Sequence, residues 1–323
     1  MKTLILVALA ITLCFTPAWA EFPERPITIL VGFGPGGTID LITRALATKA
    51  SGILNQQVIV ENRGGGGGSV ALGVVAAAKP DGYTLCTMQN ASIVDTALLQ
   101  KVPYRPLASF TPILAFAASD HSALLVAKDA PWRTMKEFVD FAKQNPGKIK
   151  YGTSGVGTGM HVAMEMLAKQ EKINWVHIPY KTSVDVRTAA LGKHIDAVSS
   201  GTDWVPFVKS GDLRVLGTHG AKRCPQSPDV PTFKEMGYLY VSEILHCAVG
   251  PAGMPADVVA KLEAAFTKAM ESTEFNTVRD NVFLSPAYMN GKDYAQSLKE
   301  RWAKMEKIYK EIGLIKEPAT QPY

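Results

Sequence analysis

The sequence predicts an α/β protein of two domains, and three observations lead to this fold class. Strand-like apolar runs alternate with helix-like segments along most of the chain, which is typical of a sheet covered by helices. The length of 323 residues exceeds the usual size of a single hydrophobic core. The alternation stops at a Pro-rich segment, residues 102–112, and then starts again, so we expect a second α/β unit after it.

The first twenty residues match an export signal. Lys2 precedes an apolar run from Leu4 to Phe15, and Ala18-Trp19-Ala20 has the small residues of a cleavage site. We expect cleavage after Ala20. The apolar run is too short to span a bilayer comfortably, and no later run reaches that length. We therefore expect an exported protein with no segment inserted into a membrane.

In the first unit, strands and helices follow one another in the order of a parallel sheet. Ile39, Ile42, Leu46 and Ala50 recur at spacings of three and four, which places one apolar face of a helix against that sheet. The predicted elements are a strand at 27–31, a helix from Thr38, a strand at 58–61, a helix from Ser69 and a strand at 83–88.

The second unit repeats this alternation without obvious sequence identity to the first. Thr134 and Glu137 form a T-x-x-E capping box at the start of its first helix. The predicted elements are a strand at 124–127, a helix that ends before Pro146, a strand at 148–152, a helix at 159–171, a strand at 175–180, a helix at 184–191, and strands at 195–199 and 213–218.

The chain is mostly helical after Pro255, and its last helix needs a sheet to cover. One apolar face of that helix is formed by Leu298, Trp302, Met305, Tyr309 and Ile312. We expect it to cover the first sheet, so that residues 21–123 and 247–323 form domain 1 and residues 124–246 form domain 2. The chain would then cross twice, near 119–123 and 246–251, and form a hinge beside a cleft, where ligands commonly bind.

Three glycine-rich loops each join a strand to a helix, at residues 31–40, 64–68 and 152–159. A helix start offers unpaired N–H groups and a partial positive charge, and glycine lets a ligand approach the backbone closely. The first two loops therefore predict a site for a carboxylate or phosphate. The third would close on the ligand from the opposite wall.

Four side chains near these loops have two possible roles each. Thr38 is a natural N-cap whose hydroxyl could also face the cleft. Asp40 either stabilises the first helical turn and its loop or meets an amino group of the ligand. His161 is more often a packing or capping residue than a base. Asp203, near the end of a strand-like element, is either a solvated or capping residue or a contact of the ligand.

A dinucleotide-binding site is the main alternative to a site for a small carboxylate or phosphate. Gly32, Gly34 and Gly37 spell G-x-G-x-x-G between a strand and a helix, and Glu61 ends the next strand. A secreted oxidoreductase would use this loop. The export signal disfavours a nicotinamide cofactor, however, and a dinucleotide fold does not require the glycines after Glu61. We expect no cofactor and no enzyme activity.

Other classes of site lack support in the sequence. The serine-hydrolase motif G-x-S-x-G fails at Ser154, because the second glycine is misplaced. The six histidines are scattered, so we expect no metal site. The net charge of +5 comes without a cluster of Lys and Arg among aromatic residues, so we expect no nucleic-acid binding. Cys86, Cys224 and Cys247 allow at most one disulfide, and buried free thiols are the simpler expectation.

Several motifs together resemble the Bug-type extracytoplasmic solute receptors of tripartite tricarboxylate transporters. The similarity runs in register from Pro26 to about Pro255, and its specific part is PGG-x-x-D in the first loop with VENR and the following glycines in the second. The resemblance implies a two-domain, Venus-flytrap periplasmic binding protein that holds a small carboxylated solute and delivers it to integral membrane transporter subunits. Presentation of the ligand to a sensor kinase is the alternative, and we expect a monomer.

The resemblance also implies which residues contact the ligand. One carboxylate would lie between the two glycine-rich loops of domain 1, and domain 2 would close over it. The turn after Pro179 departs from the family pattern, so the distal group of the ligand is not specified. The candidate residues, with Asp203 added, are Gly36, Gly37, Thr38, Asp40, Gly67, Gly68, Ser69, Gly157, Thr158, His161, Tyr180, Thr182, Ser183 and Asp203.

Overall fold

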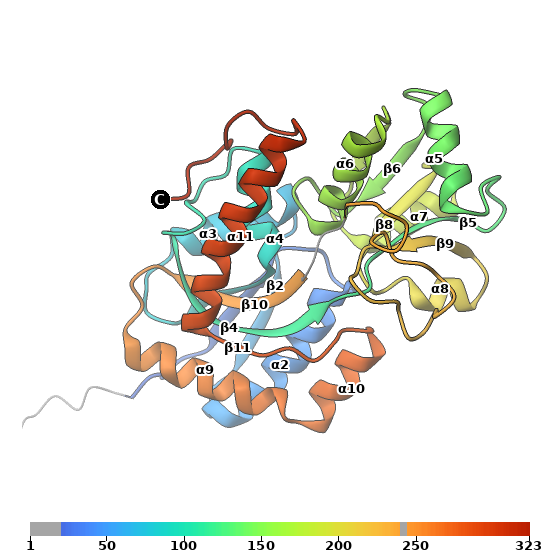
Figure 1. The fold of residues 1–323 in the computed structure, drawn as a ribbon. Helices are drawn as coiled ribbons and strands as arrows, with labels where there is room; N and C mark the ends of the chain where they lie inside the picture. Colours follow the sequence, from blue (N-terminus) through green and yellow to red (C-terminus); the bar gives the residue numbers. More distant parts are fainter. Residues whose placement is uncertain (1–20, 240–243) are drawn as a thin grey trace, which may run out of the picture.

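The computed structural model describes residues 21–239 and 244–323. The predicted export signal, residues 1–20, lies outside them. The described chain forms two lobes that lie side by side, each built on one sheet and covered by helices (Figure 1). We call the part of the chain built on the six-stranded sheet lobe 1 and the part built on the five-stranded sheet lobe 2.

Lobe 1 contains a mixed sheet with the strand order β11-β4-β10-β3-β1-β2. β1 pairs in parallel with β2 and β3, as predicted. β10 runs antiparallel to both β3 and β4, so the sheet as a whole is mixed. The reason is that β10 returns from lobe 2 alongside the strand that leaves for it. The bounds are β1 Ile27–Val31, β2 Val58–Asn62, β3 Thr84–Gln89, β4 Phe110–Ser119, β10 Ile244–Pro251 and β11 Met289–Asn290.

Six helices and one short 3-10 turn are described in lobe 1. α2 packs against α9 and α10, while α11 packs against α4 and β4 (Figure 1). The apolar face predicted for the last helix is buried at Leu298, Trp302, Met305 and Tyr309. α4 was not predicted. The bounds are α2 Thr38–Leu54, η1 Gly66–Gly68, α3 Ser69–Ala76, α4 Asn90–Leu99, α9 Ala256–Met270, α10 Thr273–Asn281 and α11 Gly291–Glu311.

Lobe 2 contains a sheet with the strand order β7-β6-β8-β5-β9, in which β5 runs antiparallel to both of its neighbours. Three of its four described helices, α5, α6 and α7, begin at a threonine side-chain cap. The Thr134 hydroxyl accepts a hydrogen bond from the Glu137 N–H at 3.2 Å, as the capping box predicts. The bounds are β5 Ala123–Ala127, α5 Met135–Gln144, β6 Lys150–Thr153, α6 Gly159–Glu171, β7 Val176–Pro179, α7 Ser183–Leu191, β8 Ala197–Ser200, α8 Val205–Lys209 and β9 Leu213–Thr218.

The chain passes between the lobes where β4 leads into β5, and β10 belongs to lobe 1 from Ile244 onward. β10 therefore starts three residues before the boundary expected at 247. The lobes also share packing, because Met160 and Met166 of α6 lie in the hydrophobic cluster of lobe 1. A small apolar interface of this kind can hold two lobes together and still open.

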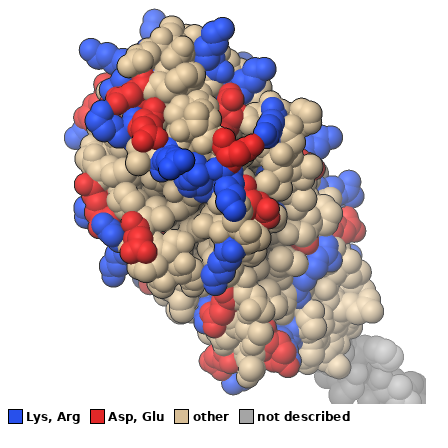
Figure 2. All heavy atoms as spheres, turned by 90° about the vertical axis from the view of Figure 1, so that its right-hand side faces the viewer, with Lys and Arg blue, Asp and Glu red and all other residues tan. Residues whose placement is uncertain are grey.

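The described residues can be compared with the expectations for disulfides, metal sites, membrane helices and surface charge. Cys86, Cys224 and Cys247 are free and buried, as expected. The described part of the chain holds no group of three or more His, Cys, Asp or Glu side chains placed to bind a metal. None of its helices has both the length and the apolar character to cross a bilayer. On the face shown in Figure 2, acidic side chains lie among the basic ones.

Candidate functional site

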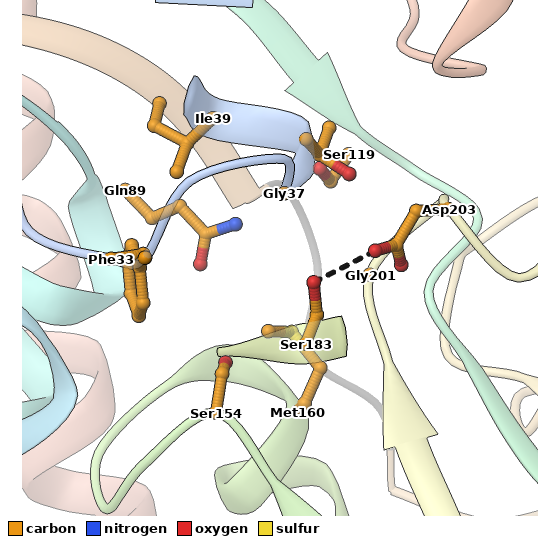
Figure 3. A pocket seen from close by; sticks show the side chains of 12 residues that line it. Phe33, Gly37, Ile39, Gln89, Ser119, Ser154, Met160, Ser183, Gly201 and Asp203 are labelled. Atoms are coloured by element: carbon orange, nitrogen blue, oxygen red, sulfur yellow. Dashed lines mark hydrogen bonds between the residues drawn. The ribbon is translucent and has the colours of Figure 1, made fainter. Parts of the chain in front are cut away.

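A cavity lies between the two lobes, at the carboxyl end of β1. Its volume is about 40 Å³, and it opens to solvent. Figure 3 shows side chains from both lobes turned toward this space. The lining residues are Phe33, Gly34, Gly37, Thr38, Ile39, Gln89, Ser119, Ser154, Met160, Ser183, Gly201 and Asp203.

The first glycine-rich loop brings the start of α2 to the cavity. Gly37 is the N-cap residue, in extended conformation, and no side chain caps the helix. The first N–H groups of a helix have no intrahelical partner, so those of α2 are available to a ligand. The Thr38 hydroxyl is buried, and no hydrogen-bond partner for it is found in the described structure. A buried hydroxyl without a partner is costly. The arrangement therefore favours an acceptor group, such as a carboxylate oxygen, at the start of α2.

Asp40 holds the loop in place rather than lining the cavity. Its carboxylate accepts hydrogen bonds from the Gly36 N–H at 2.9 Å, from Arg44 Nε at 3.0 Å and from Asn62 Nδ2 at 2.8 Å. Burial alone would raise the pKa of Asp40, but these hydrogen bonds and the Arg44 charge outweigh it and lower the pKa. These contacts match the loop-fixing role considered for Asp40.

Replacing Asp40 with Asn should destabilise the protein at neutral pH, and the difference should shrink in acid. Because the folded state lowers the pKa of Asp40, its stabilisation is fully present above the unfolded pKa of about 4. It is lost as the pH falls through the lower folded-state value. Urea unfolding of both proteins between about pH 7 and pH 2.5 measures this difference.

The exposed Asp185 of α7 provides the matched control for this prediction. Asp185→Asn makes the same chemical change on the surface of lobe 2 and should affect stability little. A stability loss in Asp40→Asn that stays constant from neutral to acidic pH would show that the ionised form of Asp40 does not hold the loop.

The wall of the cavity in lobe 2 is built around Asp203. The Ser183 hydroxyl donates to Asp203 Oδ2 at 2.8 Å (Figure 3), and the Ser200 hydroxyl donates to Oδ1 at 2.9 Å. Arg187, which is 6% exposed, also donates to Oδ2 and forms a buried ion pair. Burying both charges together is far less costly than burying either alone.

The second and third glycine-rich loops touch each other across the lobes. A Cβ atom built on Gly67 would lie 2.2 Å from the Val156 oxygen of lobe 2. The Thr96 hydroxyl of α4 donates to the same oxygen at 3.4 Å. A Cβ atom on Gly157 would lie 2.3 Å from the Thr96 Cα atom. The backbones therefore approach more closely here than any side chain would allow.

His161 has a local structural role behind the third loop. Its Nδ1 atom accepts a hydrogen bond from the Gly157 N–H at 3.3 Å, and its own N–H donates to the Thr158 hydroxyl at 3.4 Å. Burial lowers the pKa of His161 to about 4, so the ring is neutral at physiological pH. A neutral ring with this partner supports the loop, as the capping interpretation predicted.

The structure brings some of the candidate residues to the cavity and leaves others beside it. Gly37, Thr38, Ser183 and Asp203 line the cavity. The others form the loops around it or the contact between the lobes: Gly36, Asp40, Gly67, Gly68, Ser69, Gly157, Thr158, His161, Tyr180 and Thr182. Whether any of these residues binds a ligand stays a prediction.

Sequence reasoning missed several lining residues, including Gln89, Ser119 and Met160. A signal for Gln89 was present, because it is the last residue of β3 and the carboxyl ends of neighbouring parallel strands meet at one edge. Ser119 ends β4, at the predicted crossing. Met160 could not be found in this way, since it reaches the cavity only through the packing of α6 against lobe 1.

A family model described as tripartite tricarboxylate transporter family receptor matches residues 42–314. The chain belongs to this family. A relative from Cupriavidus necator, described as the UPF0065 protein in the gbd 5' region, is 37% identical over 310 residues, covering 95% of this chain and 94% of that protein. Family membership confirms the resemblance drawn from the motifs.

Three solved structures share the fold. The periplasmic binding protein BugD is 29% identical, with a TM-score of 0.84 over 90% of this chain and 99% of BugD. MatC from Rhodopseudomonas palustris, solved with malate, is 26% identical with a TM-score of 0.83 over 89% and 99%. Another R. palustris protein, solved with adipate, is 25% identical with a TM-score of 0.84 over 91% and 99%.

The family model and the solved structures together identify the class of this protein. It is a solute receptor with the fold of a periplasmic binding protein, and not an enzyme, as the sequence predicted. The alternative of a secreted oxidoreductase that uses Gly32, Gly34 and Gly37 is therefore not retained.

Proposed function

We propose that this receptor binds a small carboxylated organic solute in the cavity between its lobes and delivers it to a tripartite tricarboxylate type membrane transporter. The sequence motifs allow a di- or tricarboxylate, an acidic amino acid or an aromatic acid. One carboxylate would lie at the start of α2, and closure of lobe 2 would complete the contacts.

One observation carries this proposal: the Thr38 hydroxyl is buried without a partner at the start of a helix that opens onto the cavity. Helix N-terminus and hydroxyl together supply hydrogen-bond donors to an anion. The relatives solved with malate and adipate support a carboxylate as that anion, because both ligands are carboxylic acids.

The proposed location and partner rest on the family and on the predicted export signal. We propose export to the periplasm, cleavage after Ala20, and action as a monomer. The partner would be the integral membrane subunits of the transporter, since the family takes its description from that system. Pull-down of the ligand-loaded receptor from membranes should retain those subunits, whereas recovery of a sensor kinase would favour the alternative of ligand sensing.

Ligand binding is tested by calorimetry and thermal unfolding of the mature chain with a panel of small carboxylic acids. A ligand at about 100 times its dissociation constant should stabilise the folded state by about 3 kcal/mol. Thr38→Val, which keeps the shape but removes the hydroxyl, should weaken binding of that ligand by about tenfold, because one hydrogen bond to a charged group is lost.

Thr48→Val is the matched control, since Thr48 is an exposed residue of the same helix. It should leave the affinity unchanged. Failure of every carboxylic acid to stabilise the wild-type chain would overturn the proposed function. Equal affinity in Thr38→Val and wild type would place the bound acid away from the start of α2.

A further inference from the structure

The two walls of the cavity differ in the kind of hydrogen bond that they offer. The start of α2 in lobe 1 presents donors, as described above. Lobe 2 presents Asp203, which is the one ionisable side chain among the described residues that line the cavity. The Gln89 amide adds a buried oxygen, Oε1, for which no partner is found in the described structure. Away from α2, these acceptors lie beside the hydroxyl groups of Ser119 and Ser154, which can donate or accept.

The hydrogen bonds of Asp203 leave it able to accept one more. Oδ2 already accepts from Ser183 and Arg187, whereas Oδ1 accepts only from Ser200. A carboxylate has about four acceptor positions, so Oδ1 retains one. The ion pair with Arg187 fixes the orientation of Asp203, which is a condition for selecting among ligands by hydrogen bonding.

Arg187 cannot take the place of Asp203 as the group that a ligand meets. Its guanidinium lies over the Phe207 ring of α8, 4.9 Å from the centroid. The side chain is 8% exposed and is not among the residues that line the cavity. The cation therefore lies behind Asp203, whereas Asp203 itself lines the cavity.

From this geometry we infer that Asp203 selects acids whose far end donates a hydrogen bond, such as hydroxy or amino acids with a single carboxylate. The inference rests on the proposed function and narrows its solute class. A second carboxylate would place acceptor oxygens against the acceptor oxygens of Asp203 with no donor between them, whereas a hydroxyl or ammonium group would donate to Oδ1. The chain would thus differ from the relatives solved with malate and adipate.

The test uses the mature chain, freed of bound solute, and calorimetry with straight-chain acids of three to six carbons. At each length the far end is a methyl, a hydroxyl, an amino group or a carboxylate. For the length that binds best, the hydroxyl or amino form should bind at least about tenfold more tightly than both the methyl and the dicarboxylate forms.

Two variants assign this preference to Asp203. Asp203→Asn should reduce the preference for a donor over a carboxylate at least about tenfold, because the Asn amide can donate a hydrogen bond to a carboxylate. The double variant Asp203→Asn with Arg187→Met removes both charges, so it tests the same point if the single variant folds poorly. Asp185→Asn, on the exposed surface of α7, should keep the wild-type preference.

The outcomes separate this inference from the proposed function. Tighter binding of the dicarboxylate or methyl form to the wild-type chain would overturn the selection by Asp203 while leaving a carboxylate receptor in place. An unchanged preference in both Asp203 variants would also overturn it. Binding of no acid in the series, together with failure of the wider panel, would instead overturn the proposed function.

Discussion

Gly67→Ala should weaken ligand binding about 100-fold or more, which is the largest effect on affinity that we expect from a single methyl group. The added Cβ atom would lie 2.2 Å from the Val156 oxygen, far inside normal contact distance. Val156 belongs to a loop with backbone neighbours on both sides, so it cannot rotate away as a side chain could. The lobes would have to stay apart, and the ligand would lose its lobe 2 contacts.

Calorimetry measures the loss of affinity in Gly67→Ala, and small-angle X-ray scattering measures closure. Ligand should reduce the radius of gyration of the wild type but not of the variant. Part of the effect could come from backbone strain, because Gly67 has a φ of +66°, which is costly for alanine. Gly147→Ala controls for this: Gly147 has a φ of +75° with nothing within 4 Å of the added atom.

Gly147→Ala should lose some stability and keep its affinity. If Gly67→Ala bound ligand as tightly as the wild type and became equally compact, the contact between the glycine loops would not be part of the liganded state. If both variants lost affinity equally, strain rather than the approach of the lobes would be the cause.

Much of the fold could be predicted because local patterns determine it. The strand Ile27–Val31, the helix Gly159–Glu171 and the strand Leu213–Thr218 have the predicted bounds, since each combines a clear apolar period with a turn or cap at its ends. α4 was missed because nine of its residues, including Asp95 and Thr96, are buried, so no polar face revealed a helical period.

The site was less predictable than the fold, because it depends on how the lobes meet. Thr38 and Gly37 were identified from the loop that carries them. For Ser183 and Asp203, the sequence indicated the neighbourhood but not the ion pair with Arg187 behind them. The direct contact of Gly67 with Val156 joins loops about ninety residues apart, and no local pattern specifies such an approach.

α4 is held in place by a buried ion pair with the last helix. Asp95, whose side chain is fully buried, accepts hydrogen bonds from Arg301 Nε at 2.9 Å and from the Tyr309 hydroxyl at 2.9 Å. Both partners belong to α11. The same α4 helix starts directly after Gln89 at the cavity and carries Thr96 at the contact between the lobes. Asp95 therefore links the stability of lobe 1 to the geometry of the site.

Asp95→Asn should lower the free energy of unfolding by about 3–5 kcal/mol, because the charge of Arg301 loses its buried counter-charge. Urea unfolding followed by circular dichroism measures this loss. Asp140→Asn is the control: Asp140 forms an exposed pair with Lys136 within α5, and such pairs contribute little. A loss no larger than that of Asp140→Asn would show that packing, rather than the ion pair, fixes α11 on α4. Folded Asp95→Asn should also bind ligand more weakly, because α4 positions both Gln89 and Thr96.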